Sequence, residues 1–286
     1  MINNRDSLKA KLKNLSKETN INTNYLLQRF MFDGLLRRIV ISKYKEKFIV
    51  KGGMLLTSIF GVKLRSTMDL DATLKGIPLN SETITNVFKE LIAIDANDKI
   101  AFEFVGIKKI KEQDIYGGFN VSLKATFDNL WTNLRVDITT GDIITYKEIT
   151  FDYKTLFDNK TISILSYNYE TIIAEKYESI ISRNIDNSRM KDYYDLYMFV
   201  NLKFSEINKD VLYQAVKNTS EKRETTNYIE NSKETIKKIE KDRHIRNLWS
   251  DYQNKYDYAK SIDFEDVVSA IKTIAEMVTP SDSKAK

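Results

Sequence analysis

The first 165 residues carry short apolar stretches in which apolar and polar positions often alternate. Such alternation predicts strands, because successive side chains of a strand point to opposite faces of the sheet. The stretches are bounded by turn-forming residues, and longer segments with helical spacing lie between them. The pattern predicts a mixed sheet with intervening helices, with strands near residues 48–50, 66–74, 99–110, 120–128, 133–140 and 161–165.

The periodicity changes near residue 165. From Tyr169 to Val278 the apolar residues recur at helical spacing, and stretches rich in Lys and Glu, such as 231–241, supply exposed faces. Only two prolines and nine glycines interrupt the chain, so the domain boundary rests on the change of period. We predict an α+β protein with a sheet domain and its N-terminal helices in residues 1–165, and a helical bundle in residues 166–286.

Composition narrows the possible chemistry. The chain of 286 residues has 42% hydrophobic and 30% charged residues, which is typical of a globular protein. It has no Cys and a single His, His244, which excludes thiol nucleophiles, disulfides and mechanisms that need two histidines. No segment has the apolar run of a signal peptide or of a membrane helix, which leads us to expect a cytoplasmic protein without membrane contact.

Positive charge is concentrated at the N-terminus. Residues 1–51 contain twelve Lys and Arg against four Asp and Glu, whereas the remaining residues contain 33 against 36. A clustered basic surplus can attract a polyanion such as RNA through counterion release. A solvated basic face without a partner explains the same distribution.

An acidic pair marks the segment from Arg65 to Asp71. In a strand, Asp69 and Asp71 project to one face, while Met68, Leu70 and Ala72 take the opposite, core face. Two adjacent carboxylates repel each other unless one is protonated or a cation lies between them, and Mg²⁺ with its oxygen ligands is the usual solution. The alternative is an exposed strand face without a metal.

Two glycines precede this pair. Gly52 and Gly53 follow a strand-like stretch and open a short apolar helix that Gly61 would end. Backbone amides at such a helix N-terminus can bind phosphate, and glycine allows the ligand to approach closely. A tight turn explains a lone Gly-Gly as well, but glycine turn, Arg65 and acidic pair together favour a nucleoside triphosphate.

Asp137 has a similar setting on a second predicted strand. Leu134, Val136 and Ile138 face one side of this strand, and Arg135 and Asp137 face the other. If the strand neighbours that of Asp69 and Asp71, three carboxylates can hold two metal ions. A salt bridge to Arg135, or an exposed strand position, remains open.

In the helical half, Lys176 lies within an apolar stripe, where its ammonium needs a carboxylate, a phosphate or solvent at the edge of the stripe. Arg183 follows on the same face. Asp192 and Asp195 are neighbours on a helix that is apolar nearly all round, so we expect cationic partners for them. Arg189, Lys176 and Arg183 are the candidates, in a structural ion-pair network or in the wall of an active site.

In order along the chain, these residues resemble the AbiEii/AbiGii toxin family of bacterial nucleotidyltransferases. The resemblance includes the segment 24–30 and rests on Lys51-Gly52-Gly53, Arg65-x-Thr67-x-Asp69-x-Asp71, Asp137, Ala174-Glu175-Lys176 with Arg183, and Lys191-Asp192-x-x-Asp195-Leu196. It implies a polymerase-β-like nucleotidyltransferase domain followed by a helical domain.

The resemblance also implies a set of roles. Asp69 and Asp71 match metal-binding acids, which Asp137 would join, and Gly52 and Gly53 match a phosphate-contacting turn. Lys176 matches a lysine that contacts triphosphate, and Asp192 a later acidic motif. Where many relatives place Ser after the glycine, Met54 stands here, so Thr57 or Ser58 would supply the hydroxyl.

The function implied is that of a toxin in a toxin–antitoxin system of abortive infection by phage. The toxin would use Mg²⁺, as one or two ions, to transfer a nucleotide from an NTP to RNA, with the tRNA 3′ end as the expected acceptor, and so block translation. A cognate antitoxin would be its protein partner. Two alternatives stay open: a nucleotidyltransferase that acts on a small molecule or a protein, and a non-catalytic nucleotide- or RNA-binding protein.

Overall fold

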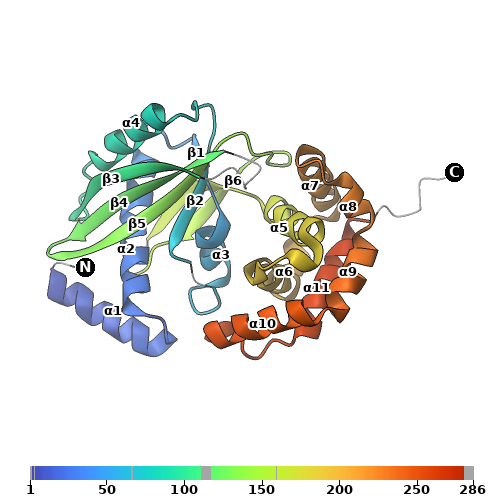
Figure 1. Ribbon diagram of the computed structural model, residues 1–286. Coiled ribbons are helices and arrows are strands. Elements are labelled where there is room, and N and C mark those ends of the chain that lie inside the picture. Colours follow the sequence, from blue (N-terminus) through green and yellow to red (C-terminus); the bar gives the residue numbers. More distant parts are fainter. Residues whose placement is uncertain (1, 3, 66, 111–116, 159, 280–286) are drawn as a thin grey trace. The chain divides into compact units, whose positions relative to one another are not determined.

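The computed structural model describes residues 2, 4–65, 67–110, 117–158 and 160–279 (Figure 1). The chain separates into two compact units, which we describe one at a time. The first comprises Met1–Asp142 and Glu148–Tyr167, and the second comprises Ile143–Lys147 and Asn168–Lys286. The first unit thus ends two residues after the predicted boundary at 165, and a five-residue segment before that boundary joins the second.

The first unit is built on a mixed sheet. Over the described residues its seven strands lie in the order β3-β4-β5-β2-β1-β7-β6, with parallel pairs at β2–β5 and β1–β7 and antiparallel pairs elsewhere. Its elements are α1 (Arg5–Thr19), α2 (Thr23–Ile41), β1 (Phe48–Lys51), α3 (Gly52–Phe60), β2 (Asp69–Leu74), α4 (Ser81–Ile92), β3 (Ile100–Ile110), β4 (Gly118–Phe127), β5 (Leu130–Thr139), β6 (Ile149–Lys154) and β7 (Thr161–Ser166).

Alternation along β4 and β5 gives the sheet one buried face. Val121, Leu123 and Ala125 of β4 are fully buried, as are Val136 and Ile138 of β5. Helix α2 packs against β4 and β5, and α4 packs against β3. The residues between these apolar positions therefore point to the other face of the sheet.

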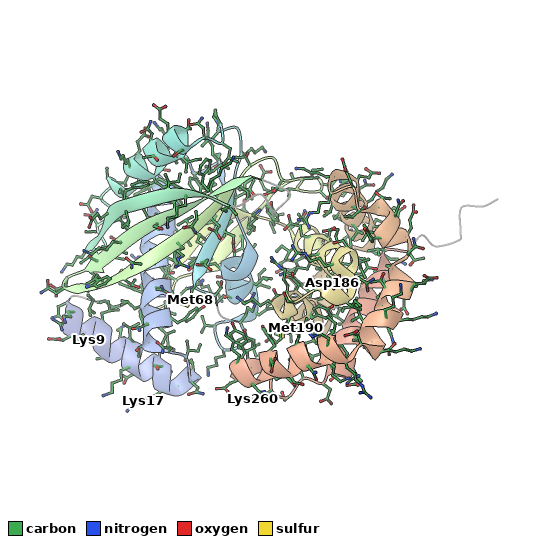
Figure 2. All side chains as sticks on the ribbon, viewed as in Figure 1. Lys9, Lys17, Met68, Asp186, Met190 and Lys260 are labelled. Carbon is green, nitrogen blue, oxygen red and sulfur yellow. The ribbon has the colours of Figure 1, made fainter. Side chains whose placement is uncertain are left out.

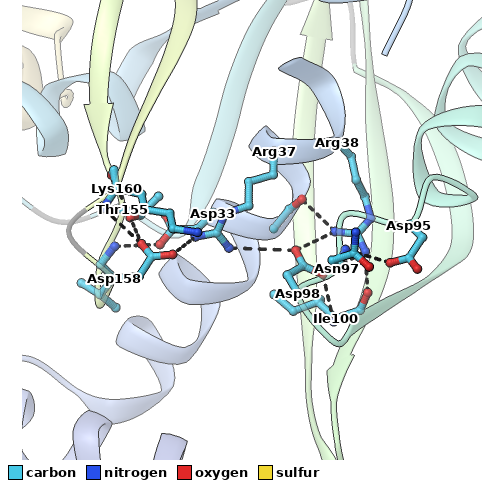
Figure 3. Close-up of polar contacts among 12 residues, drawn as sticks. Asp33, Arg37, Arg38, Asp95, Asn97, Asp98, Ile100, Thr155, Asp158 and Lys160 are labelled. Atoms are coloured by element: carbon cyan, nitrogen blue, oxygen red, sulfur yellow. Dashed lines mark hydrogen bonds and ion pairs between the residues drawn. The ribbon is translucent and has the colours of Figure 1, made fainter. Parts of the chain in front are cut away.

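Helix α2 is held to the sheet by ion pairs at two of its arginines (Figure 3). Arg38, only 3% exposed, donates to both carboxylate oxygens of Asp98 at 2.9 and 3.1 Å, just before β3. Arg37 pairs with Asp158 at 2.8 Å, in the turn between β6 and β7. The bidentate geometry and burial make the Arg38 pair the more constraining of the two.

These contacts change the interpretation of the N-terminal charge. Arg29 and Arg38 are buried within the unit, and Arg37 has acidic partners at Asp98 and Asp158, so they add little to a surface that could attract a polyanion. Lys9 and Lys17 of α1 are exposed (Figure 2). The basic surplus is therefore partly neutralised inside the protein.

The second unit is helical. Its α-helices among the described residues are α5 (Tyr169–Arg183), α6 (Met190–Leu202), α7 (Lys209–Lys222), α8 (Thr226–Glu230), α9 (Ser232–Lys241), α10 (Arg243–Lys255) and α11 (Phe264–Met277). Helix α5 packs against α6 and α7, and α11 packs against α6 and α9. Fully buried side chains such as Ile173, Tyr194 and Ile271 form the core between them.

The α+β fold class predicted from the periodicity is confirmed, and two local expectations are wrong. Strand β6 lies in a stretch for which the pattern predicted no strand. Met68 does not reach the core: β2 begins only at Asp69, and the Met68 side chain is 53% exposed (Figure 2). In the part of the chain that the structure describes, no helix is long and apolar enough to cross a membrane.

Replacing Asp98 by Asn should lower the free energy of unfolding by about 3 kcal/mol, because it leaves the guanidinium of Arg38 buried without a countercharge. Asp158→Asn removes the partly exposed pair with Arg37 and should cost about 1 kcal/mol or less. Urea denaturation of both variants at pH 7 measures the difference. Equal losses would show that the Arg38 pair does not anchor α2.

Candidate functional site

Two strands bring three carboxylates to one region of the sheet. Asp69 and Asp71 lie on β2, where Leu70 and Ala72 between and after them are fully buried. Strand β5 pairs with β2 in parallel, and the register sets Asp71 opposite Asp137. The predicted condition, that the two acidic strands are neighbours, is met.

The carboxylates interact through their charges. Burial raises the pKa of Asp71, and the negative charge of Asp137 raises it further. The ammonium of Lys51 and a bond from the amide of Gly53 oppose this rise without cancelling it. The pKa of Asp71 reaches about 6, from an ordinary value of 3.8. A site that disfavours a second negative charge in this way attracts a cation.

Asn120 orients the third carboxylate. It lies on β4 opposite Asp137, and its side-chain amide donates to Asp137 Oδ1 at 2.6 Å. An amide donor keeps the carboxylate of Asp137 in place without adding a charge. The bond also shows where Asp137 points: to the face of the sheet that carries Asn120, away from the buried apolar residues.

The glycine turn lies directly against Asp71. Gly52 has a φ of +64°, and a Cβ at this position would come within 2.0 Å of Asp71 Oδ2. The amide of Gly53 donates to the same oxygen at 3.3 Å, and a Cβ on Gly53 would come within 2.7 Å of Thr67. Both glycines are therefore required by close approach. The predicted helix, α3, begins with them and is capped by Gly61.

The residues predicted to support phosphate binding are placed as follows. Thr57 is 1% exposed, and its hydroxyl donates to the carbonyl of Gly53 within α3, at 2.9 Å. Ser58, the other candidate hydroxyl, accepts a bond from Arg29 at 2.8 Å. Arg65 is 3% exposed and follows α3 after Gly61. A phosphate contact from Thr57 would require its helical bond to break.

A buried ion pair lies next to the turn. Lys51 donates to Asp142 Oδ2 at 2.6 Å, and the same oxygen accepts from Thr139 at 2.7 Å and from Tyr167 at 2.8 Å. Thr73 also donates to it. Burial alone would raise the pKa of Asp142, but Lys51 and the hydroxyls lower it to about 2. Asp142 is therefore held ionised and fixes the position of the Lys51 ammonium.

Neither Asp142 nor Asn120 was singled out from the sequence, and Lys51 carried no assigned role. Lys51 precedes Gly52 and lies opposite Asp71 in the β1–β2 register, so its ammonium acts on that carboxylate. Two features of the sequence could have drawn attention to them. Asp142 is an acid soon after the strand of Asp137, and Asn120 is a polar residue in the alternating pattern of β4. Such signals acquire meaning only when the strand neighbours are known.

The donor set suits Mg²⁺. Among the described residues, no three His, Cys, Asp or Glu side chains form a ready-made cage for a metal. Mg²⁺ is usually bound by only one or two carboxylates, with water and substrate phosphates completing the shell. Asp69, Asp71 and Asp137 supply hard oxygen donors. Burial is the main cause of the raised pKa of Asp71, and the negative charges of Asp137 and Asp69 add to it, so a divalent ion at this place would offset both.

In the second unit, Lys176 joins two acids. Its ammonium lies 2.7 Å from Asp192 Oδ1 and 2.7 Å from Asp195 Oδ2, and both acids are buried. Arg189 donates to the other oxygen of Asp192 at 2.9 Å. Burial alone would raise the pKa of Asp192, but the charges of Lys176 and Arg189 lower it below its ordinary value. Of the predicted cationic partners, Lys176 and Arg189 are confirmed, while Arg183 is exposed at the end of α5.

The first unit thus brings together the paired acids of β2, a third acid on the adjacent strand and a glycine turn against Asp71. Residues 34–270 match the sequence model of the family described as "Nucleotidyl transferase AbiEii toxin, Type IV TA system". The chain belongs to this family of toxin nucleotidyltransferases, as the resemblance predicted. Membership implies a nucleotide substrate and a cognate antitoxin.

Comparison with solved structures finds more distant similarity. A candidate nucleotidyltransferase from Helicobacter pylori has 14% identity over 90% of this chain and 97% of that chain, with a TM-score of 0.48. JHP933 from Helicobacter pylori has 13% identity over 90% and 93%, with a TM-score of 0.47. An antigenic nucleotidyltransferase-like protein from Paracoccidioides brasiliensis has 15% identity over 67% and 89%, with a TM-score of 0.38. No curated protein matches the sequence.

Asp71→Asn should stabilise the metal-free protein at pH 7. Because the pKa of Asp71 is higher in the folded protein, at about 6, than the 3.8 of an ordinary carboxyl, the folded state loses stability as pH rises between these values. Asn can still accept from Gly53 and carries no charge. We expect a gain of up to about 3 kcal/mol at pH 7, shrinking towards zero near pH 4, in denaturation of both proteins across pH. A pH-independent difference would refute the electrostatic explanation.

Asp142→Asn should destabilise the protein by about 3 kcal/mol at pH 7, because the Lys51 ammonium loses its buried countercharge. Thr139→Val removes one hydroxyl donor to the same oxygen and should cost about 1 kcal/mol. The pKa of Asp142 is lowered, so its contribution is lost as pH falls from about 4 towards 2. Urea denaturation of both variants tests this order, and an Asp142 loss no larger than that of Thr139 would contradict it.

Proposed function

We propose that this protein uses Mg²⁺ to transfer a nucleotide from an NTP to RNA, with the tRNA 3′ end as acceptor, and thereby blocks translation in abortive infection by phage. The observation that carries the proposal is the register of Asp71 with Asp137, together with the glycine turn against Asp71. Family membership supports the toxin role, and the resemblance of the motifs supports the RNA acceptor.

The reaction would be an in-line displacement at the α-phosphate of the NTP. A hydroxyl oxygen of the acceptor forms a bond to phosphorus, pyrophosphate leaves, and the hydroxyl proton passes to Asp137. Mg²⁺ held by Asp69 and Asp71 would neutralise charge that develops on the phosphate oxygens. Asn120 keeps Asp137 oriented. Positioning and electrostatics would carry most of the rate enhancement, because the protein forms no covalent bond.

The glycine turn would meet the phosphates. The first amides of α3 have no partner within the helix, and Gly52 and Gly53 place no side chain between them and a ligand. The Gly53 amide donates to Asp71 Oδ2 at 3.3 Å, a long bond that a bond to a phosphate oxygen could replace. Arg65 would add positive charge near the end of the same helix.

In the second unit, Lys176 would contact the triphosphate, as the motif resemblance implies. Its two short bonds to Asp192 and Asp195 fix the ammonium, so that little side-chain entropy remains to be lost on binding. Asp192 would contribute indirectly, by holding the ammonium of Lys176 in position. Arg183, exposed on the same helix, would add a further phosphate contact.

Incubation with total bacterial RNA, Mg²⁺ and each labelled NTP in turn should place label on a band of tRNA size, and EDTA should abolish it. Asp71→Asn should reduce transfer at least 100-fold, because it removes a carboxylate from the metal site. Asp152→Asn is a matched control, since Asp152 is an exposed strand acid of the same sheet on β6 and should transfer at the wild-type rate.

The outcomes separate the candidate functions. Label on a low-molecular-weight or protein acceptor, lost in Asp71→Asn, would keep the chemistry and refute the RNA acceptor. Full transfer by Asp71→Asn would refute the assignment of the catalytic acids. No labelled product with any NTP or acceptor would favour a binding protein over an enzyme.

A further inference from the structure

The sheet of the first unit has an exposed face beside the carboxylates. Helices α2 and α4 pack against one face of β3, β4 and β5 (Figure 1). The side chains that alternate with the buried apolar residues of these strands point to the other face. We call these positions the open face. It consists of Ala101, Glu103, Gly106 and Lys108 on β3, Asn120, Ser122, Lys124 and Thr126 on β4, and Trp131, Asn133, Arg135 and Asp137 on β5.

The strand registers arrange the open face in rows that lead into the carboxylate cluster. One row runs from Lys108 through Asn120 and Asp137 to Asp71. A second row ends in Arg135 beside Asp69. Further rows, through Lys124 with Asn133 and through Thr126 with Trp131, lie progressively farther from the carboxylates. The open face and the candidate catalytic acids are therefore one continuous surface of one sheet.

The far end of this surface carries an unusual residue for an exposed strand. Trp131 is 58% exposed, and the ammonium of Lys124 lies 5.6 Å from the centre of its ring. An exposed indole with a cation beside it is a platform on which a nucleobase can stack while its phosphate meets the cation. Without a ligand, a large exposed aromatic side chain on a sheet is unfavourable, because it promotes non-specific association between protein molecules.

Charge favours a nucleic acid as the occupant. Outside the carboxylate cluster, the described residues of the open face include three cations, Lys108, Lys124 and Arg135, against one acid, Glu103. Glu103 lies 3.8 Å from Lys124 and is itself highly exposed. The other polar side chains of the face are amides and hydroxyls, which bind sugar and phosphate without charge.

The dimensions fit a single strand. Asp137 lies six positions after Trp131 on β5, which corresponds to about 20 Å along an extended strand. This is a path of a few nucleotides, with stacking at one end, cations along it and the carboxylates at the other end. A duplex would hide the base faces that Trp131 requires.

We propose that the open face binds the single-stranded end of the RNA acceptor, with a base stacked on Trp131, the backbone on Lys124 and Arg135, and the 3′ end directed to Asp69, Asp71 and Asp137. This inference rests on the proposed function, because it presupposes an RNA acceptor. It assigns substrate contacts to residues that lie outside the motifs of the family resemblance.

The test is binding of a short fluorescein-labelled single-stranded RNA to the full-length protein, measured by anisotropy. Trp131→Ala should raise Kd about 5- to 100-fold, whereas Trp131→Phe should retain most of the affinity because a phenyl ring still stacks. Lys124→Gln should lower the slope of log Kd against log salt by about 0.7, as expected for one lost phosphate contact to a single strand. A blunt duplex of the same sequence should bind more weakly than the single strand.

Tyr228→Ala is the matched control, because Tyr228 lies on α8 and has a similar exposed fraction of 53%. Its affinity for RNA should stay close to that of the wild type. The binding of a fluorescent NTP should be the same in all these variants, which shows that they remain folded. Wild-type affinity of Trp131→Ala for RNA would overturn the inference, as would failure of the unaltered protein to bind single-stranded RNA.

Transfer assays distinguish this inference from the proposed function. If the unaltered protein labels RNA and Trp131→Ala does so with an unchanged KM for RNA, the open face is not the acceptor site and the proposed function stands. If no RNA is labelled but Trp131→Ala loses RNA binding, the open face binds RNA and the transfer reaction is refuted.

Discussion

The repulsion between Asp71 and Asp137 is the constraint on which the candidate site depends. The parallel register of β2 and β5 sets the two carboxylates opposite each other. Burial raises the pKa of Asp71, and the charge of Asp137 adds to this rise, which reaches about 6. A fold selected for stability alone would place an uncharged residue there. The protein instead retains the acid, and ionisable groups with such shifted pKa values are concentrated at functional sites.

The surrounding residues limit this cost without removing it. Lys51 contributes a positive charge, but Asp142 accepts its ammonium at 2.6 Å and so keeps the lysine from neutralising Asp71 completely. The amide of Gly53 contributes one weak bond at 3.3 Å. Gly52 must lack a side chain for this approach to occur at all. The site is therefore pre-organised yet keeps an excess of negative charge.

The sequence predicted the local part of this site but not its connections. Period-two alternation placed Asp69 and Asp71 on one face of their strand. On the second acidic strand, it placed Asp137 on the face opposite the apolar residues. It could not show that β2 and β5 are neighbours, because pairing between strands distant in the chain is set by tertiary packing. The expectation of a buried Met68 and the absence of β6 from the predicted strands were wrong for the same reason. Burial and pairing partners, rather than the local pattern, decide where a short strand forms and begins.

The position of positive charge shows why counting it along the chain is insufficient. Arg38, part of the N-terminal basic surplus, is buried in a bidentate pair with Asp98, where it anchors α2 and cannot meet a polyanion. Lys124 and Arg135 of the open face, by contrast, belong to strands that each contain a single Lys or Arg. Only through the registers of β4, β5 and β2 does Arg135 lie beside Asp69, with Lys124 on the same face of the sheet farther from the carboxylates. A surface suited to an acidic polymer beside an acidic site is thus a property of the sheet, because each strand contributes only one or two of its charges.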